Sequence, residues 1–401
     1  MNIRDILKVM VERNASDIYL TEGLPPMYRI EGVTQPVGSV PLTNEMLETL
    51  AKDVMRDKQK KEFEETNEMN LALFYPDMGR FRVNIFRQRG NVGFVIRQIK
   101  VEIVPIDKLG LPPIVKDIIM SKRGLVIVVG ATGSGKSTSL AAMIDHRNAN
   151  SPGHIITVED PIEFVHKHKR SVITQREIGF DTMSYHAALK NTLRQAPDVI
   201  LIGEVRDLET MEAAIAFAET GHLCLCTLHA NNANQAIERV MNFFPQERHA
   251  QIYLQLSLNL RAIISQRLIP GVDGKRVAAL EVMMDTPRIK DLIKKGEVDI
   301  IKEAMEQGVQ EGCQTFDYVL FNLYREGKIS LDQAIMNADS ANNLRLKIKL
   351  AGMKVDEEPV TGAKPAAPGA PAAAKPAAPA AAPSGFSFKG GPSAPTQFKK
   401  P

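Results

Sequence analysis

Residues 130–138 read Gly130-Ala131-Thr132-Gly133-Ser134-Gly135-Lys136-Ser137-Thr138, and this stretch decides the fold. It fits the P-loop pattern, in which a glycine and four variable residues precede Gly-Lys-Ser or Gly-Lys-Thr. The apolar run at 125–129 predicts a buried strand before it, and 139–144 predicts a helix after it. Because a phosphate-binding loop needs a strand on one side and a helix on the other, the sequence predicts a P-loop domain. The alternative is a glycine-rich turn that fits the pattern by chance.

The residue types of this loop suit a nucleotide. Glycines let successive backbone N–H groups turn toward phosphate oxygens, and the start of a helix adds positive potential there. We expect Lys136 to reach the β- and γ-phosphates and the Ser137 hydroxyl to ligate Mg²⁺. All nine residues of 130–138 are therefore candidate nucleotide-binding residues, and the expected ligands are ATP and Mg²⁺.

Composition and charge limit the classes of function. The chain has 401 residues and a net charge of +3, but five lysines lie beyond Glu358, where no acidic residue occurs, so the rest carries −2. A body that is not basic argues against direct binding of nucleic acid. The three cysteines suit a reducing cytoplasm, and no apolar run reaches the roughly 18 residues that a membrane-spanning helix needs.

Patterns along the chain predict an α/β protein with four segments. Residues 1–100 are expected to form a small α+β domain of PAS-like type, and 101–113 a proline-containing linker. Residues 114–355 are expected to form a RecA-like P-loop ATPase domain with a C-terminal helical region, and 356–401 a disordered tail rich in alanine, proline and lysine.

Two further apolar runs end in acidic residues. The run at 198–204 ends in Glu204, the position called Walker B, where a carboxylate binds Mg²⁺ through water or polarises the attacking water. The run at 155–163 ends in Glu159, Asp160 and Glu163, which repel one another unless a cation or hydrogen-bond donors offset their charge. The alternatives are an ordinary strand end with a solvated glutamate and an exposed acidic turn.

The segment 222–229 contains His222, Cys224, Cys226 and His229, which look like a zinc set. Its β-prone content predicts a strand instead, and alternation places His229 off the face that carries the other three. We therefore predict no structural zinc and expect His229 to sense the γ-phosphate. His222 serves the same end or only makes a structural hydrogen bond.

Arginines are candidate charge stabilisers for phosphoryl transfer, although most arginines only pair with surface carboxylates. The candidates are Arg82, Arg87, Arg97, Arg194 and Arg206.

With these motifs in order, the chain resembles the secretion ATPase superfamily of type II/IV secretion and type IV pilus motors. The resemblance rests on Walker A (130–138), an acidic "Asp box" (157–163), Walker B (197–207) and a "His box" (220–229). The resemblance covers about residues 1–350. Within the superfamily, the chain is similar to the retraction branch, PilT and PilU. The stretch 287–296 departs from the PilT pattern and looks like that of PilU.

The resemblance implies a homohexameric ATPase, peripheral to the cytoplasmic face of the inner membrane, that retracts pili for twitching motility as an accessory motor. It implies a PilT-type ATPase and the inner-membrane platform protein of the pilus machine as partners. Family roles fall on Glu163 (water activation), Glu204 (Walker B), His222 and His229 (His box) and Arg82 (phosphate site). Two other functions stay open: a DNA-transfer ATPase of the conjugation type, and a non-catalytic or weakly catalytic adaptor of a PilT motor.

Overall fold

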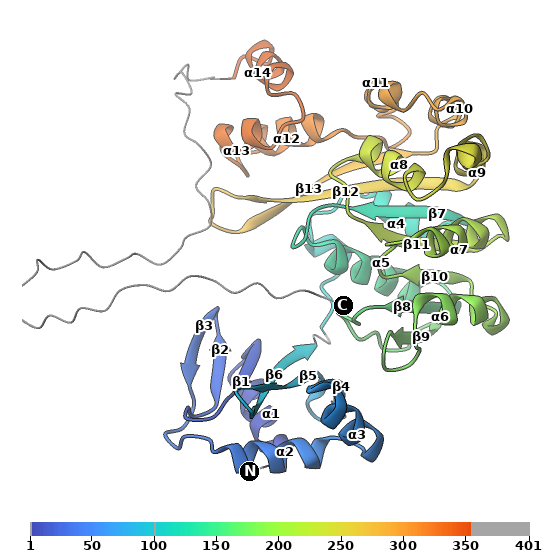
Figure 1. Ribbon diagram of the computed structural model, residues 1–401. Coiled ribbons are helices and arrows are strands. Elements are labelled where there is room, and N and C mark those ends of the chain that lie inside the picture. The colour runs from blue at the N-terminus through green and yellow to red at the C-terminus, as the bar shows by residue number, and fades with distance from the viewer. Residues whose placement is uncertain (1, 100–101, 354–401) are drawn as a thin grey trace, which may run out of the picture. The chain divides into compact units, whose positions relative to one another are not determined.

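The computed structural model describes residues 2–99 and 102–353 (Figure 1). The strands of this part of the chain form two separate sheets, one from residues 17–99 and one from residues 124–284. The tail predicted for 356–401 lies outside the described residues, and the domain boundaries stay predictions.

The first sheet has six antiparallel strands in the order β3-β2-β1-β6-β5-β4. Its strands are β1 (Asp17–Leu20), β2 (Met27–Ile30), β3 (Val33–Pro36), β4 (Glu68–Tyr75), β5 (Gly79–Gln88) and β6 (Asn91–Ile99), and its helices are α1 (Ile3–Glu12), α2 (Asn44–Val54) and α3 (Asp57–Thr66). Alternation along β5 buries Phe81, Val83 and Ile85 completely. The α+β prediction for this region and the predicted β5–β6 hairpin are confirmed.

The second sheet has seven strands in the order β13-β12-β7-β11-β10-β8-β9. Its strands are β7 (Gly124–Val129), β8 (Gly153–Glu159), β9 (Ser171–Glu177), β10 (Val199–Ile202), β11 (Leu223–Leu228), β12 (Leu260–Pro270) and β13 (Arg276–Met284). All pairs are parallel except β12–β13. Every residue of β7, β10 and β11 is buried, as continuous apolar runs require in a parallel sheet covered on both faces.

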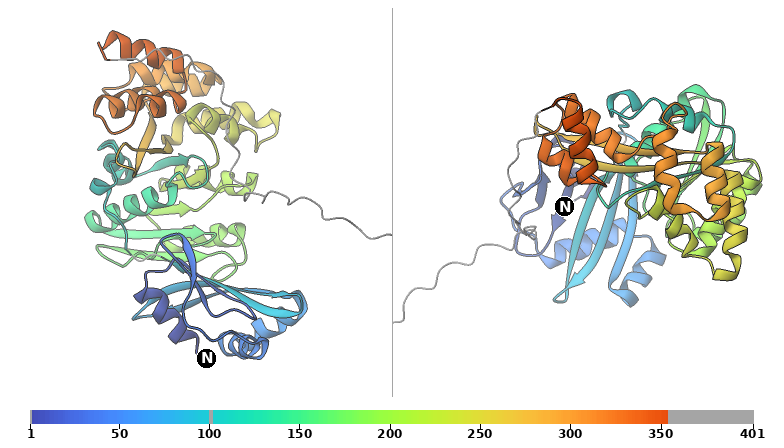
Figure 2. Two further views of the ribbon diagram at one scale, coloured as in Figure 1. Left: turned by 90° about the vertical axis from the view of Figure 1, so that its left-hand side faces the viewer. Right: turned by 90° about the horizontal axis from the view of Figure 1, so that it is seen from above.

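Helices flank this second sheet (Figure 2). They are α4 (Ile114–Met120), α5 (Lys136–Asn150), α6 (Tyr185–Thr192), α7 (Leu208–Glu219), α8 (Ala233–Met241) and α9 (His249–Asn259), with short 3₁₀ turns at η1 (Ile106–Lys108), η2 (Leu193–Gln195) and η3 (Gln246–Arg248). Helices α4 and α5 pack together, while α7 packs on α6 and α9. The predicted α/β fold is therefore confirmed.

The C-terminal part of the described chain is helical, as predicted. It contains α10 (Pro287–Lys295), η4 (Val298–Ile300), α11 (Ile301–Gln307), α12 (Phe316–Arg325), α13 (Leu331–Met336) and α14 (Ala341–Leu350). Phe316 and Leu320 form a separate small core with Ile269 and Ala279 of the β12–β13 hairpin. The sequence pattern did not indicate β13, the antiparallel edge strand on which this core is built. None of the helices in the described ranges has the length and apolar content to cross a bilayer.

Candidate active site

Four neighbouring strands carry the predicted site residues at one edge of the second sheet. In the order β7-β11-β10-β8, the P-loop follows β7, His229 follows β11, Glu204 lies two residues beyond β10, and the acidic box follows β8. These strands are parallel, so their carboxyl ends meet in the crevice where open α/β sheets bind ligands. Two of the predicted residues are in direct contact, since His229 Nε2 and Glu204 Oε1 lie 2.9 Å apart.

The P-loop backbone can be built only with glycine at its key positions. Gly130, Gly133 and Gly135 have φ angles of 150°, 78° and 90°. A Cβ atom at Gly130 would lie 2.5 Å from the Gln266 carbonyl oxygen and 2.6 Å from Ser134 Oγ. The loop therefore lies tightly against β12, and a side chain at position 130 would not fit there.

Lys136 is the first residue of α5 and turns its side chain back onto the loop. Its Nζ donates to the carbonyl oxygens of Gly130 at 2.7 Å and Ala131 at 3.0 Å. Burial lowers the pKa of Lys136, and the negative charge of Glu204 opposes that shift. The ammonium group thus lies where phosphate oxygens would enter.

The loop fits a phosphate chain. Ser134 Oγ is buried and has no hydrogen-bond partner within residues 2–99 and 102–353, and buried polar groups are rarely left without one. The start of α5 adds unpaired N–H groups and a positive dipole end at the same place. We conclude that the observed cradle suits a nucleotide phosphate group.

A Mg²⁺ ion would have few protein ligands here. In the described part of the chain, no three His, Cys, Asp or Glu side chains gather closely enough to hold a metal. Mg²⁺ retains waters and uses substrate phosphates together with one or two protein oxygens. Ser137, beside Lys136, and Glu204 suit that role.

Glu204 is shared between a histidine and an arginine. Its Oε1 lies beside His229, while its Oε2 accepts from Arg206 Nε at 2.8 Å. Arg206 also approaches Asp160, with Nη1 3.5 Å from Oδ2. Of the arginine candidates, Arg206 is thus the one that joins the Walker B glutamate to the acidic box.

The acidic box contains carboxylates in different environments. Glu159 is partly buried, and desolvation raises its pKa to about 7, while hydrogen bonds from Thr157 and Gln175 oppose the shift. Glu163 is exposed. Because solvent reaches Glu163 more readily than Glu159, Glu163 is the better placed of the two to meet a water molecule.

His222 lies at the amino end of β11, whereas His229 lies at its carboxyl end. Its Nδ1 is 3.0 Å from Thr220 Oγ1 and 3.2 Å from the Phe217 carbonyl oxygen. The structure therefore does not bring His222 to the P-loop and gives it local hydrogen bonds instead. Cys224 and Cys226 are buried within the strand between the two histidines, and burial raises the pKa of both thiols. The absence of zinc stays a prediction.

The other arginine candidates have local partners. Arg97 Nε donates to Asp17 at 2.8 Å, Arg87 Nη1 donates to Glu48 at 2.7 Å, and Arg194 lies 3.5 Å from Asn191. Arg82 of β5 stands opposite Arg97 of β6 in the first sheet. Within the described residues, Arg82 forms no hydrogen bond or ion pair with the P-loop, and its role at the phosphate site stays a prediction.

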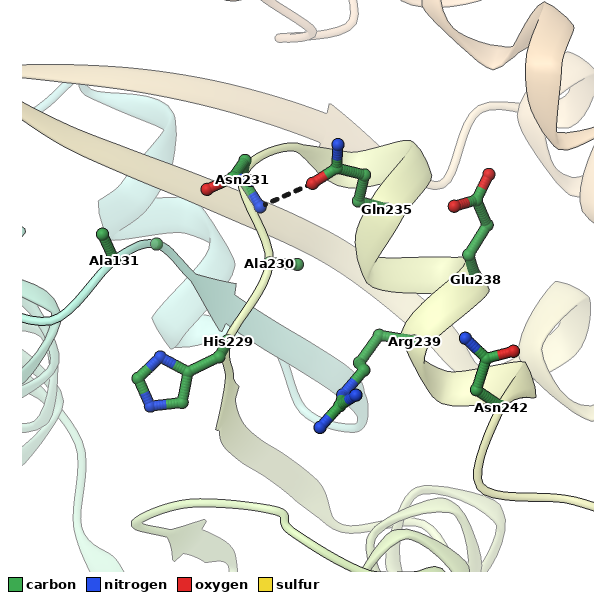
Figure 3. Close-up of a pocket in the computed structure, with 9 residues that line it drawn as sticks. Ala131, His229, Ala230, Asn231, Gln235, Glu238, Arg239 and Asn242 are labelled. Carbon is green, nitrogen blue, oxygen red and sulfur yellow. Dashed lines mark hydrogen bonds between the residues drawn. The ribbon is translucent and has the colours of Figure 1, made fainter. Parts of the chain in front are cut away.

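Arg239 is a site residue that the sequence did not indicate. A cavity of about 310 Å³ opens beside Gly130 and Ala131 and is lined by His229 together with Asn231, Gln235, Arg239 and other residues of the loop before α8 and of α8 itself (Figure 3). Asn231 N donates to Gln235 Oε1 at 3.2 Å and closes the start of the helix. Gln235 and Arg239 are four residues apart and so share one helix face, a spacing that could have suggested the pair.

Known proteins resemble the chain over most of its length. Residues 2–322 match the family described as "Type II/IV secretion system protein". The type IV pilus ATPase PilU of Pseudomonas aeruginosa is 54% identical over 351 residues, which are 87% of this chain and 92% of PilU. PilT of the same organism is 43% identical over 343 residues, 86% of this chain and 100% of PilT.

A solved structure agrees with these relatives. The crystal structure of the pilus retraction motor PilT with bound ADP has a TM-score of 0.81 and 41% sequence identity, and the match covers 86% of this chain and 99% of that one. The fold, the position of the P-loop at the carboxyl end of β7 and the relatives all point to the same family. The chain therefore belongs to the Type II/IV secretion system protein family, in its PilT and PilU branch.

Proposed function

We propose that this ATPase couples ATP hydrolysis to the retraction of a type IV pilus, as a PilU-type accessory motor. The observation that carries the proposal is the cluster of Lys136, His229 and Glu204 at one sheet edge, in a chain 54% identical to PilU. The names of PilU, PilT and a twitching motility protein of Neisseria gonorrhoeae point to the same process.

The residues of the site have complementary roles in hydrolysis. The loop 130–138 holds the phosphates, and Lys136 compensates charge that develops on them. Glu163 orients the water that attacks the γ-phosphorus, while His229, linked to Glu204, meets the γ-phosphate. Ser137 and Glu204 would hold a Mg²⁺ ion, whose positive charge would offset the negative charge of the phosphates.

The assembly is proposed from the relatives. A hexameric ring would allow a first-domain arginine, Arg82, to complete the phosphate site of a neighbouring subunit. The ring would work at the inner face of the cytoplasmic membrane, with the platform protein of the pilus machine as its load and a PilT-type hexamer as its partner. The described residues form no ion pair through Arg82, which leaves that guanidinium available to another subunit.

Pilus retraction in cells tests the function. We expect cells without this protein to retract pili under load less well than the parent, and cells that carry the Lys136→Ala variant to behave like the deletion. Cells without the PilT-type ATPase and cells without both proteins complete the comparison. Normal retraction in the deletion strain under every load would contradict the proposal.

Phosphate release by the isolated protein separates a motor from an adaptor. A motor hydrolyses ATP, and the Lys136→Ala variant loses that activity. If Lys136→Ala restored retraction in the deletion strain as fully as the parent protein, the chain would act as a structural adaptor and the motor function would be wrong.

A further inference from the structure

Tyr185 has a buried hydroxyl group beside the two acidic motifs. It is the first residue of α6, whose start is fixed by Ser184 Oγ accepting from Ala187 N at 3.1 Å. Within the described ranges, the Tyr185 hydroxyl is closed off from solvent and has no hydrogen-bond partner. A phenol group has one hydrogen to donate and can also accept, so this site is incomplete as it stands.

The surroundings show which groups this hydroxyl can serve. A Cβ atom built on Gly203 would lie 3.1 Å from the Tyr185 oxygen and 3.0 Å from Glu159 Cα. The hydroxyl therefore lies beside the carboxyl ends of β10 and β8. Gly203 and Glu159, which meet there, directly precede Glu204 and Asp160 in the chain. A side chain at position 203 would therefore crowd the hydroxyl.

The backbone groups of Gly203 are already engaged. Its N–H donates to the Val158 carbonyl oxygen at 2.7 Å, and its carbonyl oxygen accepts from Thr227 Oγ1 at 2.6 Å. The Glu204 N–H and the Asp160 carboxylate are among the groups that act electrostatically on the hydroxyl. Electrostatics agree with this placement, because burial and Asp160 raise the pKa of Tyr185 whereas the Glu204 N–H opposes the shift.

We propose that Tyr185 is a positioning residue for ATP hydrolysis, whose hydroxyl accepts from the Glu204 N–H and donates toward Asp160, directly or through one water molecule. The hydroxyl then holds the ends of β10 and β8 at a fixed spacing. Arg206, which contacts both Glu204 and Asp160, makes the same connection on the solvent side. The inference rests on the proposed role of Glu204 and adds the residue that fixes its position.

The Tyr185→Phe variant tests this idea, because it removes the oxygen and keeps the ring. We expect kcat for ATP hydrolysis to fall roughly tenfold, the scale of one lost hydrogen bond in a transition state. KM for ATP, affinity for fluorescent ADP and the melting temperature should stay close to those of the full-length parent. A residue that only fills space in the core would not lower kcat alone.

Tyr253→Phe is the matched control. Tyr253 of α9 is also partly buried and packs against Gly296, away from the acidic motifs, so its loss of a hydroxyl should leave kcat unchanged. Unchanged kcat in Tyr185→Phe, or equal losses in the two variants, would overturn the inference. Glu204→Gln is measured alongside: if it loses turnover while Tyr185→Phe does not, only the role of Tyr185 fails. If Glu204→Gln keeps turnover, the proposed role of Glu204 fails first.

Discussion

Replacing Glu204 by Gln changes the charge of the site while keeping its shape. In the parent, Oε1 lies 2.9 Å from His229 Nε2 and Oε2 accepts from Arg206. A glutamine can turn its oxygen toward Arg206 and its amide nitrogen toward His229. The histidine then accepts through Nε2 and carries its proton on Nδ1, so both contacts survive without a negative charge.

The magnitude of the change differs between folding and catalysis. The Arg206 side chain is 58% exposed, so its ion pair contributes less than about 1 kcal/mol to stability. Removing a carboxylate that orients water or Mg²⁺ in a hydrolytic site lowers the rate by about a hundredfold or more. The Glu204→Gln variant should therefore fold, bind ATP and ADP, and turn over at least about a hundredfold more slowly than the parent.

Phosphate release and titration with a fluorescent ADP analogue measure the two properties separately. Glu209→Gln is the matched control, because Glu209 is 67% exposed, lies five positions further on and pairs with His186 rather than with the site. Turnover of Glu204→Gln within about threefold of the parent would refute the reasoning. So would a folded variant that no longer binds nucleotide with Mg²⁺, since Glu204 would then be a binding residue and not a residue of the hydrolytic step.

Three further variants test other parts of the site and the fold. Lys136→Ala should lower phosphate release by about a hundredfold or more, because the Lys136 ammonium group lies on the loop itself, whereas Lys122→Ala, at an exposed position before β7, should not; equal rates in both would contradict the P-loop assignment. Arg239→Ala should weaken ADP binding by roughly tenfold at an unchanged melting temperature, and unchanged affinity would remove Arg239 from the site. Burial raises the pKa of Glu281 to about 7, above its unfolded value, so its proton stabilises the parent at low pH and this contribution is lost as the pH rises toward and through 7. Between pH 5 and 8, the free energy of unfolding of the parent should therefore fall by about 1–3 kcal/mol more than that of Glu281→Gln, as measured by chemical denaturation. An equal fall in both proteins would mean that Glu281 is not buried in neutral form.

The part of the site that sequence predicted is the part set by local signals. Each apolar run that ends in a charged residue gives a strand and its carboxyl end, and parallel pairing then brings those ends together. Glu204 and His229 are contacts of this kind, although 25 positions separate them in the chain. The P-loop could be predicted without any pairing between distant strands, because its glycines and its flanking strand and helix lie within one continuous segment.

The separation of His222 from His229 could have been anticipated from the same signals. The strand between them, β11, has six residues, and strands rise about 3.3 Å per residue, so the seven steps from His222 to His229 span about 23 Å. A motif that begins and ends with histidine therefore places one histidine at the amino end of the strand and the other at its carboxyl end. The sequence motif groups them, but strand geometry keeps them from one site.

Other site features depend on packing between distant segments, which no local pattern encodes. Glu281 lies on β13, and its Oε1 accepts from Ala233 N at 2.7 Å and from Ser265 Oγ at 3.0 Å. It thereby caps the start of α8, the helix that presents Gln235 and Arg239 to the cavity beside Gly130 and Ala131. In the sequence, Glu281 is one acidic residue in an apolar strand, and nothing nearby marks it as a helix cap.

Burial gives such contacts their importance. A buried polar group is costly unless it is paired, so the helix start at Ala233, the carboxyl group of Glu281 and the hydroxyl of Ser265 stabilise one relative position of α8, β12 and β13. Moving α8 would break these bonds and displace Arg239 from the cavity at the same time. We infer that the position of the cavity beside the P-loop depends on β13, the strand that the sequence pattern failed to show, and Glu281→Ala should accordingly disturb ADP binding more than Glu281→Gln does.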